Sequence, residues 1–177
     1  MKMLKKLLAV VLTGAMALTL LTACGGNAVT EKSIADAMND MAKVGGTNVT
    51  FTPQAQEREM AQKVAALLES HSEDDSNSAE LSAKIQGILG IDQGGVNENN
   101  FVWVQNALTD KLGAEGQAFQ VMESLTDKGG AYNFSSLGSK EPADTRYMGT
   151  ALCKIPDQKD NLVTVRVIVV TAKAEDE

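Results

Sequence analysis

The chain has 177 residues, of which 22% are charged and only 4% aromatic, and its formal net charge is −7 at pH 7. This acidic balance argues against nucleic-acid binding, which needs basic residues to neutralise phosphates. One histidine and two cysteines cannot complete a zinc site of about four such ligands, and they leave little for histidine-dependent catalysis. We therefore expect no metal and no cofactor, and the balance leans away from an enzyme.

The first 23 residues have the three parts of an export signal. A start with three lysines is followed by an almost wholly apolar run at residues 7–21 and then by small residues. The run holds 15 residues, fewer than the ~20 that span a bilayer as a helix. We expect residues 1–23 to be a cleaved signal peptide.

The four residues Leu21-Thr22-Ala23-Cys24 resemble the lipobox of bacterial lipoproteins in type, order and position. The resemblance implies that a diacylglycerol is attached to the Cys24 thiol, that the chain is cleaved between Ala23 and Cys24, and that the new amino terminus usually receives a fatty acid such as palmitate. Several acyl chains anchor stably, because each buried methylene contributes ~0.8 kcal/mol. We expect a lipid-anchored protein on the extracytoplasmic face of the cell membrane. An ordinary secretory signal with a chance cysteine is the alternative.

Loss of the signal would lower the formal charge from −7 to −10, because three lysines leave with it. An anionic membrane surface repels such a body, so the lipid must hold it there. With Cys24 acylated, Cys153 is the only thiol left. It lies in an apolar strand pattern, and we expect it to be buried and inert rather than reactive or paired with another chain.

The next segments predict a tether and then helices. Residues 24–30 are small and lack periodicity, which is typical of a lipidated tether. Helical apolar spacing predicts a helix over 31–43, and a short strand or a linker follows it. We therefore treat 31–52 as a helix and linker that precede a single domain at 53–177. Thr52-Pro53 and an apolar stripe then predict the clearest helix, which runs to about residue 70.

The middle of the chain is harder to assign. The polar stretch 71–78, which begins with the single histidine, predicts a solvated connection, and a further helix runs on to Gly90. After a turn-rich loop, Phe101-Val102-Trp103-Val104 fits either a buried strand or the start of a helix ending near residue 112. We favour the helix. Residues 114–126 predict another.

Residues 127–145 are rich in glycine, serine and turn-forming residues, which predicts a long loop. Loops of this length usually carry function or are disordered. Tyr132 and Phe134 either pack this loop down or meet a partner, and we favour packing while keeping both as possible contact residues.

The carboxyl-terminal part predicts a β-hairpin. "RYMGTALCKI" and "LVTVRVIVVTAKA" flank a turn, and the second segment is apolar at both odd and even positions. Such a strand is covered on both faces. Several helices packed on a small antiparallel sheet with this hairpin make an α+β domain.

The order of helices, the helix "AEGQAFQVMESL", a long loop and the closing hairpin resembles the CAP superfamily of secreted domains over residues 54–172. The resemblance implies an α-β-α sandwich. That family lines a cavity with paired histidines and glutamates, whereas the matching segments here have no histidine. The resemblance therefore implies a degenerate member without the metal site, and it assigns no site residues.

We expect a non-catalytic binding or envelope-accessory domain whose partner is an envelope protein or a small ligand. The alternative is an extracytoplasmic hydrolase that uses carboxylates only, for example Glu115 or Glu123 with Asp144. A third possibility is a structural role in the envelope.

Overall fold

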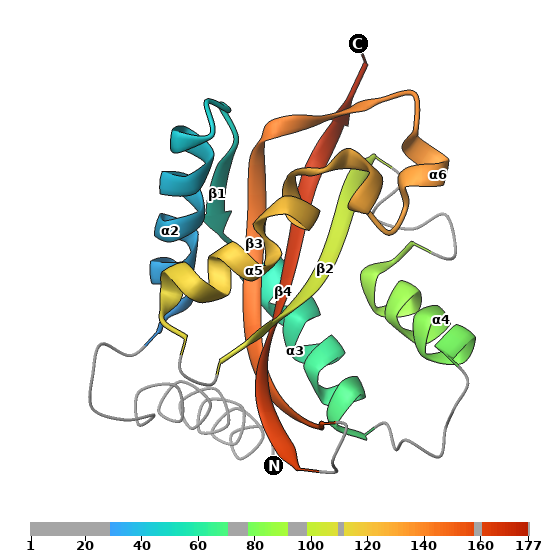
Figure 1. The fold of residues 1–177 in the computed structure, drawn as a ribbon. Coiled ribbons are helices and arrows are strands. Elements are labelled where there is room, and N and C mark those ends of the chain that lie inside the picture. The colour runs from blue at the N-terminus through green and yellow to red at the C-terminus, as the bar shows by residue number, and fades with distance from the viewer. Residues whose placement is uncertain (1–28, 71–77, 92–98, 110–111, 158–160, 177) are drawn as a thin grey trace, which may run out of the picture. The chain divides into compact units, whose positions relative to one another are not determined.

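The structure is a computed structural model that describes residues 29–70, 78–91, 99–109, 112–157 and 161–176. Residues 31–177 form one compact unit (Figure 1). In chain order its elements are α2 (Glu31–Val44), β1 (Thr50–Pro53), α3 (Ala55–Ser70), α4 (Ser78–Leu89), β2 (Asn100–Leu108), α5 (Ala114–Thr126), the 3-10 turn η1 (Lys128–Gly130), α6 (Phe134–Leu137), β3 (Glu141–Pro156) and β4 (Leu162–Glu175).

One four-stranded sheet, in the order β1-β3-β4-β2, forms the centre of the unit. The β3–β4 hairpin and the β4–β2 pair are antiparallel, whereas β1 pairs with β3 in parallel. The α+β class is confirmed, as is the central position of β4. The prediction of an antiparallel sheet is corrected to a mixed one, because β1 adds a parallel pair with β3. β1 comes from the segment that the sequence predicted as either a strand or a linker.

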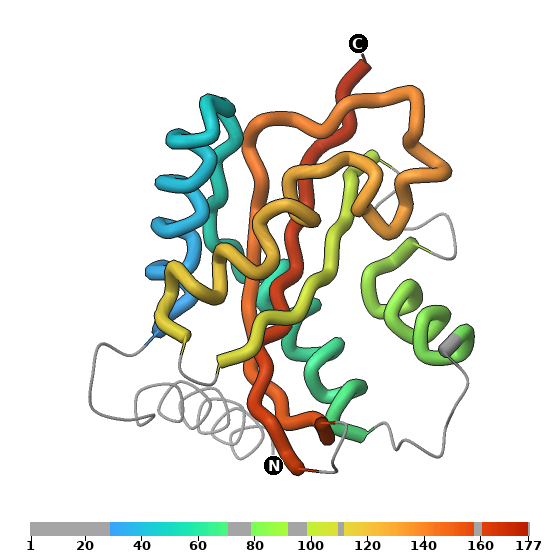
Figure 2. The backbone as a smooth tube through the Cα atoms, viewed as in Figure 1, coloured from blue at the N-terminus to red at the C-terminus, as the bar shows by residue number. Residues whose placement is uncertain are grey.

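Helices cover both faces of this sheet, as the backbone trace in Figure 2 shows. On one face, Val165, Val167 and Val169 of β4 pack with residues of α3 and α4. On the other face, Arg166 of β4 reaches Gln117 of α5, and α2 packs beside α5. The alternation of side chains along β4 thus separates an α3–α4 face from an α2–α5 face.

The backbones of α3 and β3 approach each other closely at Gly149. A Cβ added at this position would lie 1.9 Å from the backbone nitrogen of Arg58 and 2.1 Å from the backbone carbonyl carbon of Glu57. No side chain fits that space, so glycine sets how near α3 can lie to the sheet.

The preference for a helix at Phe101–Val104 is wrong, because this segment is part of β2. Phe101, Val102 and Trp103 are all fully buried, and Trp103 lies opposite Val170 in the antiparallel register with β4. Three consecutive buried residues fit a strand covered on both faces, whereas a helix on a sheet would expose at least one of them. Pairing with β4, some 65 residues away, decides the outcome.

The division at residues 52 and 53 also changes. α2 and β1 belong to the same compact unit as the rest, with Ile34, Met38 and Phe51 buried. The predicted helix at 31–43 is confirmed as α2, and the clearest helix begins at Ala55 because Pro53 ends β1. The helix at 114–126 is confirmed as α5.

The predicted loop at 127–145 is shorter than expected, because it contains η1 and α6 and gives way to β3 at Glu141. It packs on the outer edge of β2. The Tyr132 backbone N–H donates to the Val102 carbonyl at 2.7 Å, and Asn133 bonds β2 through both ends of its amide. The segment is therefore held to β2 by the Tyr132 backbone and the Asn133 amide, while the Tyr132 and Phe134 side chains stay partly exposed. The predictions at residues 71–77 and 92–98 lie outside the described residues.

Candidate binding groove

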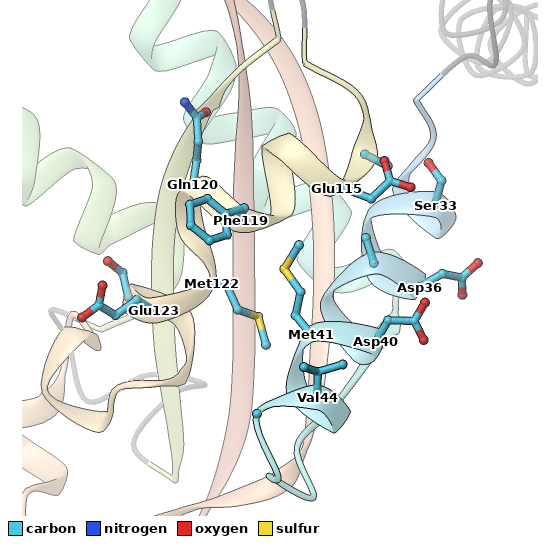
Figure 3. Close-up of a pocket in the computed structure, with 14 residues that line it drawn as sticks. Ser33, Asp36, Asp40, Met41, Val44, Glu115, Phe119, Gln120, Met122 and Glu123 are labelled. Atoms are coloured by element: carbon cyan, nitrogen blue, oxygen red, sulfur yellow. The ribbon is translucent and has the colours of Figure 1, made fainter.

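A groove of about 1050 Å³ lies between α2 and α5 on the outer side of the α2–α5 face (Figure 3). Both helices contribute similar numbers of lining residues. Those from α2 and the residue after it are Ser33, Asp36, Ala37, Asp40, Met41, Val44 and Gly45, and those from α5 are Ala114, Glu115, Phe119, Gln120, Met122, Glu123 and Ser124.

Helical periodicity explains why these residues line a surface. α2 buries Ile34, Ala35, Met38 and Ala42 in the unit, together with Ala37, which also lines the groove, and α5 buries Gln117, Ala118, Val121 and Leu125. The lining residues lie on the neighbouring ridge of each helix, three or four positions apart. Two helices that pack side by side on a sheet therefore leave their outer ridges facing one another.

The middle of the groove is apolar. Figure 3 shows Met41 and Met122 pointing toward each other across it, with Phe119 and Val44 nearby. Phe119 is 78% exposed and Val44 90% exposed, so neither residue contributes much to the core. A half-buried methionine pair next to an exposed phenylalanine forms an exposed apolar patch, and such patches are typical of binding surfaces.

Carboxylates flank this apolar middle. Asp36 and Asp40 point outward from α2, and Glu115 and Glu123 stand on α5 away from the methionines (Figure 3). All four residues are exposed, and none of the described lining residues is a lysine or an arginine. The groove therefore combines an apolar centre with an acidic surround.

A polar network fixes the start of α2. The Glu31 carboxylate accepts 2.6 Å and 3.2 Å hydrogen bonds from Arg58 of α3, and it also accepts a 2.8 Å bond from the Thr150 backbone N–H of β3. The hydrogen bond to Glu31 raises the pKa of Arg58 despite some desolvation. Glu31 therefore joins the start of α2 to both α3 and β3.

A second buried contact fixes α5. The Arg166 guanidinium donates to the Gln117 side-chain oxygen at 2.8 Å and to the Thr150 hydroxyl at 3.2 Å. Gln117 in turn donates to the Leu112 carbonyl at 3.0 Å. Burial lowers the pKa of Arg166, and attraction to Glu31 opposes that shift. Both walls of the groove thus rest on hydrogen bonds to the sheet.

Two asparagines bond to backbone groups on the outer edges of the sheet. Asn39 of α2 accepts from the Phe51 N–H at 2.6 Å and donates to the Phe51 carbonyl at 3.0 Å. Asn133 accepts from the Val102 N–H at 3.1 Å and donates to the Asn100 carbonyl at 2.7 Å. Side-chain amides therefore occupy edge groups of β1 and β2 that would otherwise pair with an added strand.

Arg146 of β3 is buried on the same face, with its guanidinium carbon 4.7 Å from the centre of the Trp103 ring. Its Nε and Nη1 atoms have no hydrogen-bond partner within the described part of the chain. Desolvation lowers the pKa of Arg146 to about 10, although attraction to Asp144 opposes the shift. The Trp103 ring offers the cation a partial substitute for solvent.

The residues singled out from the sequence lie mostly away from this groove. Ala23, Cys24 and His71 are outside the described residues. Tyr132 and Phe134 are 36% and 38% exposed in the segment beside β2, and neither lines the groove. Cys153 is buried, as expected, and burial raises its pKa to about 11.

The carboxylates suggested for hydrolysis are divided by the fold. Glu115 and Glu123 line the groove, whereas Asp144 is in β3 and does not. Within the residues that the structure describes, no group of three His, Cys, Asp or Glu side chains is placed to hold a metal ion.

The contribution of α2 to a site was missed. The sequence offers Met41 and Phe119 only as apolar residues at helical spacing, yet in the structure Phe119 is 78% exposed and Met41 is half-buried. The sequence carried no signal for this exposure, because Phe119 has the same helical spacing as the buried Leu125. The packing of α2 on α5, more than 70 residues later, could not be read locally.

No protein-family model matches the chain, and no curated protein is significantly similar to it. Over the described ranges, none of the helices has the length and apolar character needed to cross a bilayer.

Proposed function

We propose that this protein is a lipid-anchored, non-catalytic binding domain on the extracytoplasmic face of the cell membrane, and that the α2–α5 groove receives its partner. The observation that carries the proposal is the 78% exposure of Phe119 beside two methionines in a groove of about 1050 Å³. A cavity of this size, apolar in the middle and polar around it, is typical of binding sites.

The anchor rests on Leu21-Thr22-Ala23-Cys24 and on the basic and apolar segments before it. Acylation of Cys24 would hold an acidic domain at a membrane that its own charge does not favour. A partner located in the cell envelope would then be at a high effective concentration near the domain, so a weak affinity of the groove would suffice for binding.

A carboxylate-only hydrolase is the weaker proposal. Glu115 and Glu123 stand eight positions apart on α5, which separates them by ~12 Å along the helix axis. Paired carboxylates that cleave glycosidic bonds lie about 5 to 10 Å apart. Asp144, the other suggested member of a pair, does not line the groove.

The relation to CAP domains remains a proposal of the same kind. Helices on both faces of the sheet are compatible with the α-β-α sandwich that this resemblance implies. A degenerate CAP-like domain would also bind without catalysis, so the proposed role does not depend on which family is the right one.

Two measurements test the proposed function. The intact mass of the protein from a membrane fraction should equal residues 24–177 plus acyl chains, and Cys24→Ser should move the protein to the soluble fraction. A photo-crosslinking residue at position 119 should capture a partner in cells that the same residue at Leu162, which is 70% exposed outside the groove, does not capture. A mass without acyl chains would contradict the proposed lipid anchor. Identical crosslinked products from both positions would contradict the proposal that the groove receives the partner.

A further inference from the structure

We propose that the α2–α5 groove receives a basic amphipathic helix of a partner protein. This inference rests on the binding role proposed above for the same groove, and it adds the charge and the form of the occupant.

The charge follows from the carboxylates around the groove. Asp36 is paired with Lys32 at 2.6 Å on the exposed side of α2. The exposed carboxylates of Asp40, Glu115 and Glu123 have no such ion pair within the described ranges. Since no described lining residue is basic, the occupant is the natural source of positive charge.

The apolar middle requires that the same occupant also be apolar on one side. Met41 and Met122 face each other, and Phe119 and Val44 extend the patch. Methionine is unbranched and flexible, so a pair of methionines adapts to apolar side chains of different shapes. A segment with lysines or arginines flanking an apolar stripe satisfies both parts of the groove.

The form of the occupant follows from which backbone groups are free. Both walls of the groove are helices, whose backbone groups bond internally, so the groove itself offers no strand edge. Addition of a strand is therefore disfavoured, which leaves a helix in a groove as the recognition mode. The α2 wall runs from Ser33 to Val44, ~16 Å or about three turns of a docked helix.

Two other occupants fit less well. An anionic lipid surface would bring phosphates against Asp40, Glu115 and Glu123. A second copy of the chain docked groove to groove would oppose the same carboxylates to each other. Repulsion disfavours both, whereas a basic helix gains from the same charges.

The test uses the whole mature chain, residues 24–177 with Cys24→Ser, and two synthetic peptides of about 14 residues, enough for about four helical turns. Both peptides carry leucines on one face, and they carry either lysines or glutamates on the other. Fluorescence anisotropy should show that the lysine peptide binds at least about tenfold tighter than the glutamate peptide at low salt. The difference should shrink at 1 M salt, where the Debye length is only about 3 Å.

Variants place the binding in the groove. Phe119→Ala should weaken the lysine peptide about tenfold or more, as loss of an interface aromatic usually does. Asp40→Asn combined with Glu123→Gln should weaken it about fivefold. The matched controls lie outside the groove and should change nothing: Leu162→Ala removes another exposed apolar side chain, and Glu175→Gln with Asp176→Asn removes the same charge.

Each alternative result has a separate meaning. If the neutral apolar dye N-phenyl-1-naphthylamine binds in a Phe119-dependent way and neither peptide does, the groove takes a small ligand and this inference is overturned while the binding role stands. If neither dye nor peptides bind, both proposals fail. Three further results would each overturn the proposal of a basic helix as the occupant. They are equal binding of the lysine peptide to wild type and Phe119→Ala, a dimer that Phe119→Ala abolishes, and Phe119-dependent binding to phosphatidylglycerol vesicles.

Discussion

The two faces of the sheet are closed in different ways. On the α3–α4 face, small and branched apolar residues fill the space, and the backbones of α3 and β3 come into contact at Gly149. On the α2–α5 face, two arginines are buried, and the outer surface leaves Phe119 exposed. The α3–α4 face therefore contributes mainly packing, whereas the α2–α5 face uses a polar network to hold two helices whose outer ridges stay free. Stability and binding should be separable by mutation.

The largest effect should come from the α3–α4 face. Gly149→Ala forces α3 away from β3, because the new Cβ would lie 1.9 Å from the Arg58 nitrogen. We expect a loss of about 3 kcal/mol or more in the free energy of unfolding, measured by urea denaturation. Gly113→Ala is the control, since its Cβ would meet only the movable Glu115 carboxylate at 3.3 Å, and it should cost less than about 1 kcal/mol. Equal costs for both variants would contradict the close packing.

The polar network of the α2–α5 face should give the next largest effect. Arg166→Met leaves the buried Gln117 oxygen and the Thr150 hydroxyl without this donor, and we expect a loss of about 2–4 kcal/mol. Arg146→Met is the matched control, because two nitrogens of Arg146 make no hydrogen bond in the described structure. It should change stability by less than about 1 kcal/mol. A larger loss of unfolding free energy for Arg146→Met than for Arg166→Met would contradict the view that Arg166 stabilises the fold more than Arg146 does.

The pH dependence of stability should reveal the thiol in the α3–α4 core. Burial raises the pKa of Cys153 from 9.0 to about 11, so the folded protein keeps this proton where the unfolded chain releases it. Stability from this group is complete below pH 9 and is lost as the pH rises toward 11, by on the order of 1–2 kcal/mol. The difference in unfolding free energy between wild type and Cys153→Ala should shrink over that range. A constant difference would show that the thiolate forms in the folded state without penalty.

The smallest effect should come from the groove itself. Phe119 is 78% exposed, so Phe119→Ser should change the free energy of unfolding by less than about 0.5 kcal/mol. Leu125→Ser on the same helix removes a fully buried side chain and should be severely destabilising. Thermal unfolding of the two variants makes the comparison. A marked destabilisation by Phe119→Ser would mean that this residue serves the fold and that the groove is weaker evidence for a partner.

Local patterns predicted much of this fold. The apolar stripes of α2, α3 and α5 repeat at helical spacing, and the alternating valines of β4 identify a strand covered on both faces. Each of these patterns depends on neighbours a few positions away, so it can be read without the partner elements.

The errors arise where a distant partner decides the structure. Phe101–Val104 carries four apolar residues that suit a helix or a strand, and only the pairing of β2 with β4 selects the strand. The segment of β1 was left open between a strand and a linker, and it is a strand because β3 lies beside it. Stretches this short carry too little periodicity to decide for themselves.

The candidate site was harder to predict than the fold. The groove exists because α2 packs beside α5, and neither helix carries a recognisable motif. Phe119 has helical spacing to other apolar residues of α5, so the sequence does not distinguish an exposed aromatic from a core one. Only the orientation of the helix on the sheet does so.

Hydrogen exchange with the lysine peptide bound tests the account most directly, because it reports on both faces at once. We predict slower amide exchange in α2 (Glu31–Val44) and α5 (Ala114–Thr126), and unchanged exchange in α3 (Ala55–Ser70). Protection confined to α3 and α4, or protection in none of these helices at saturating peptide, would contradict the division between a packed face and a binding face.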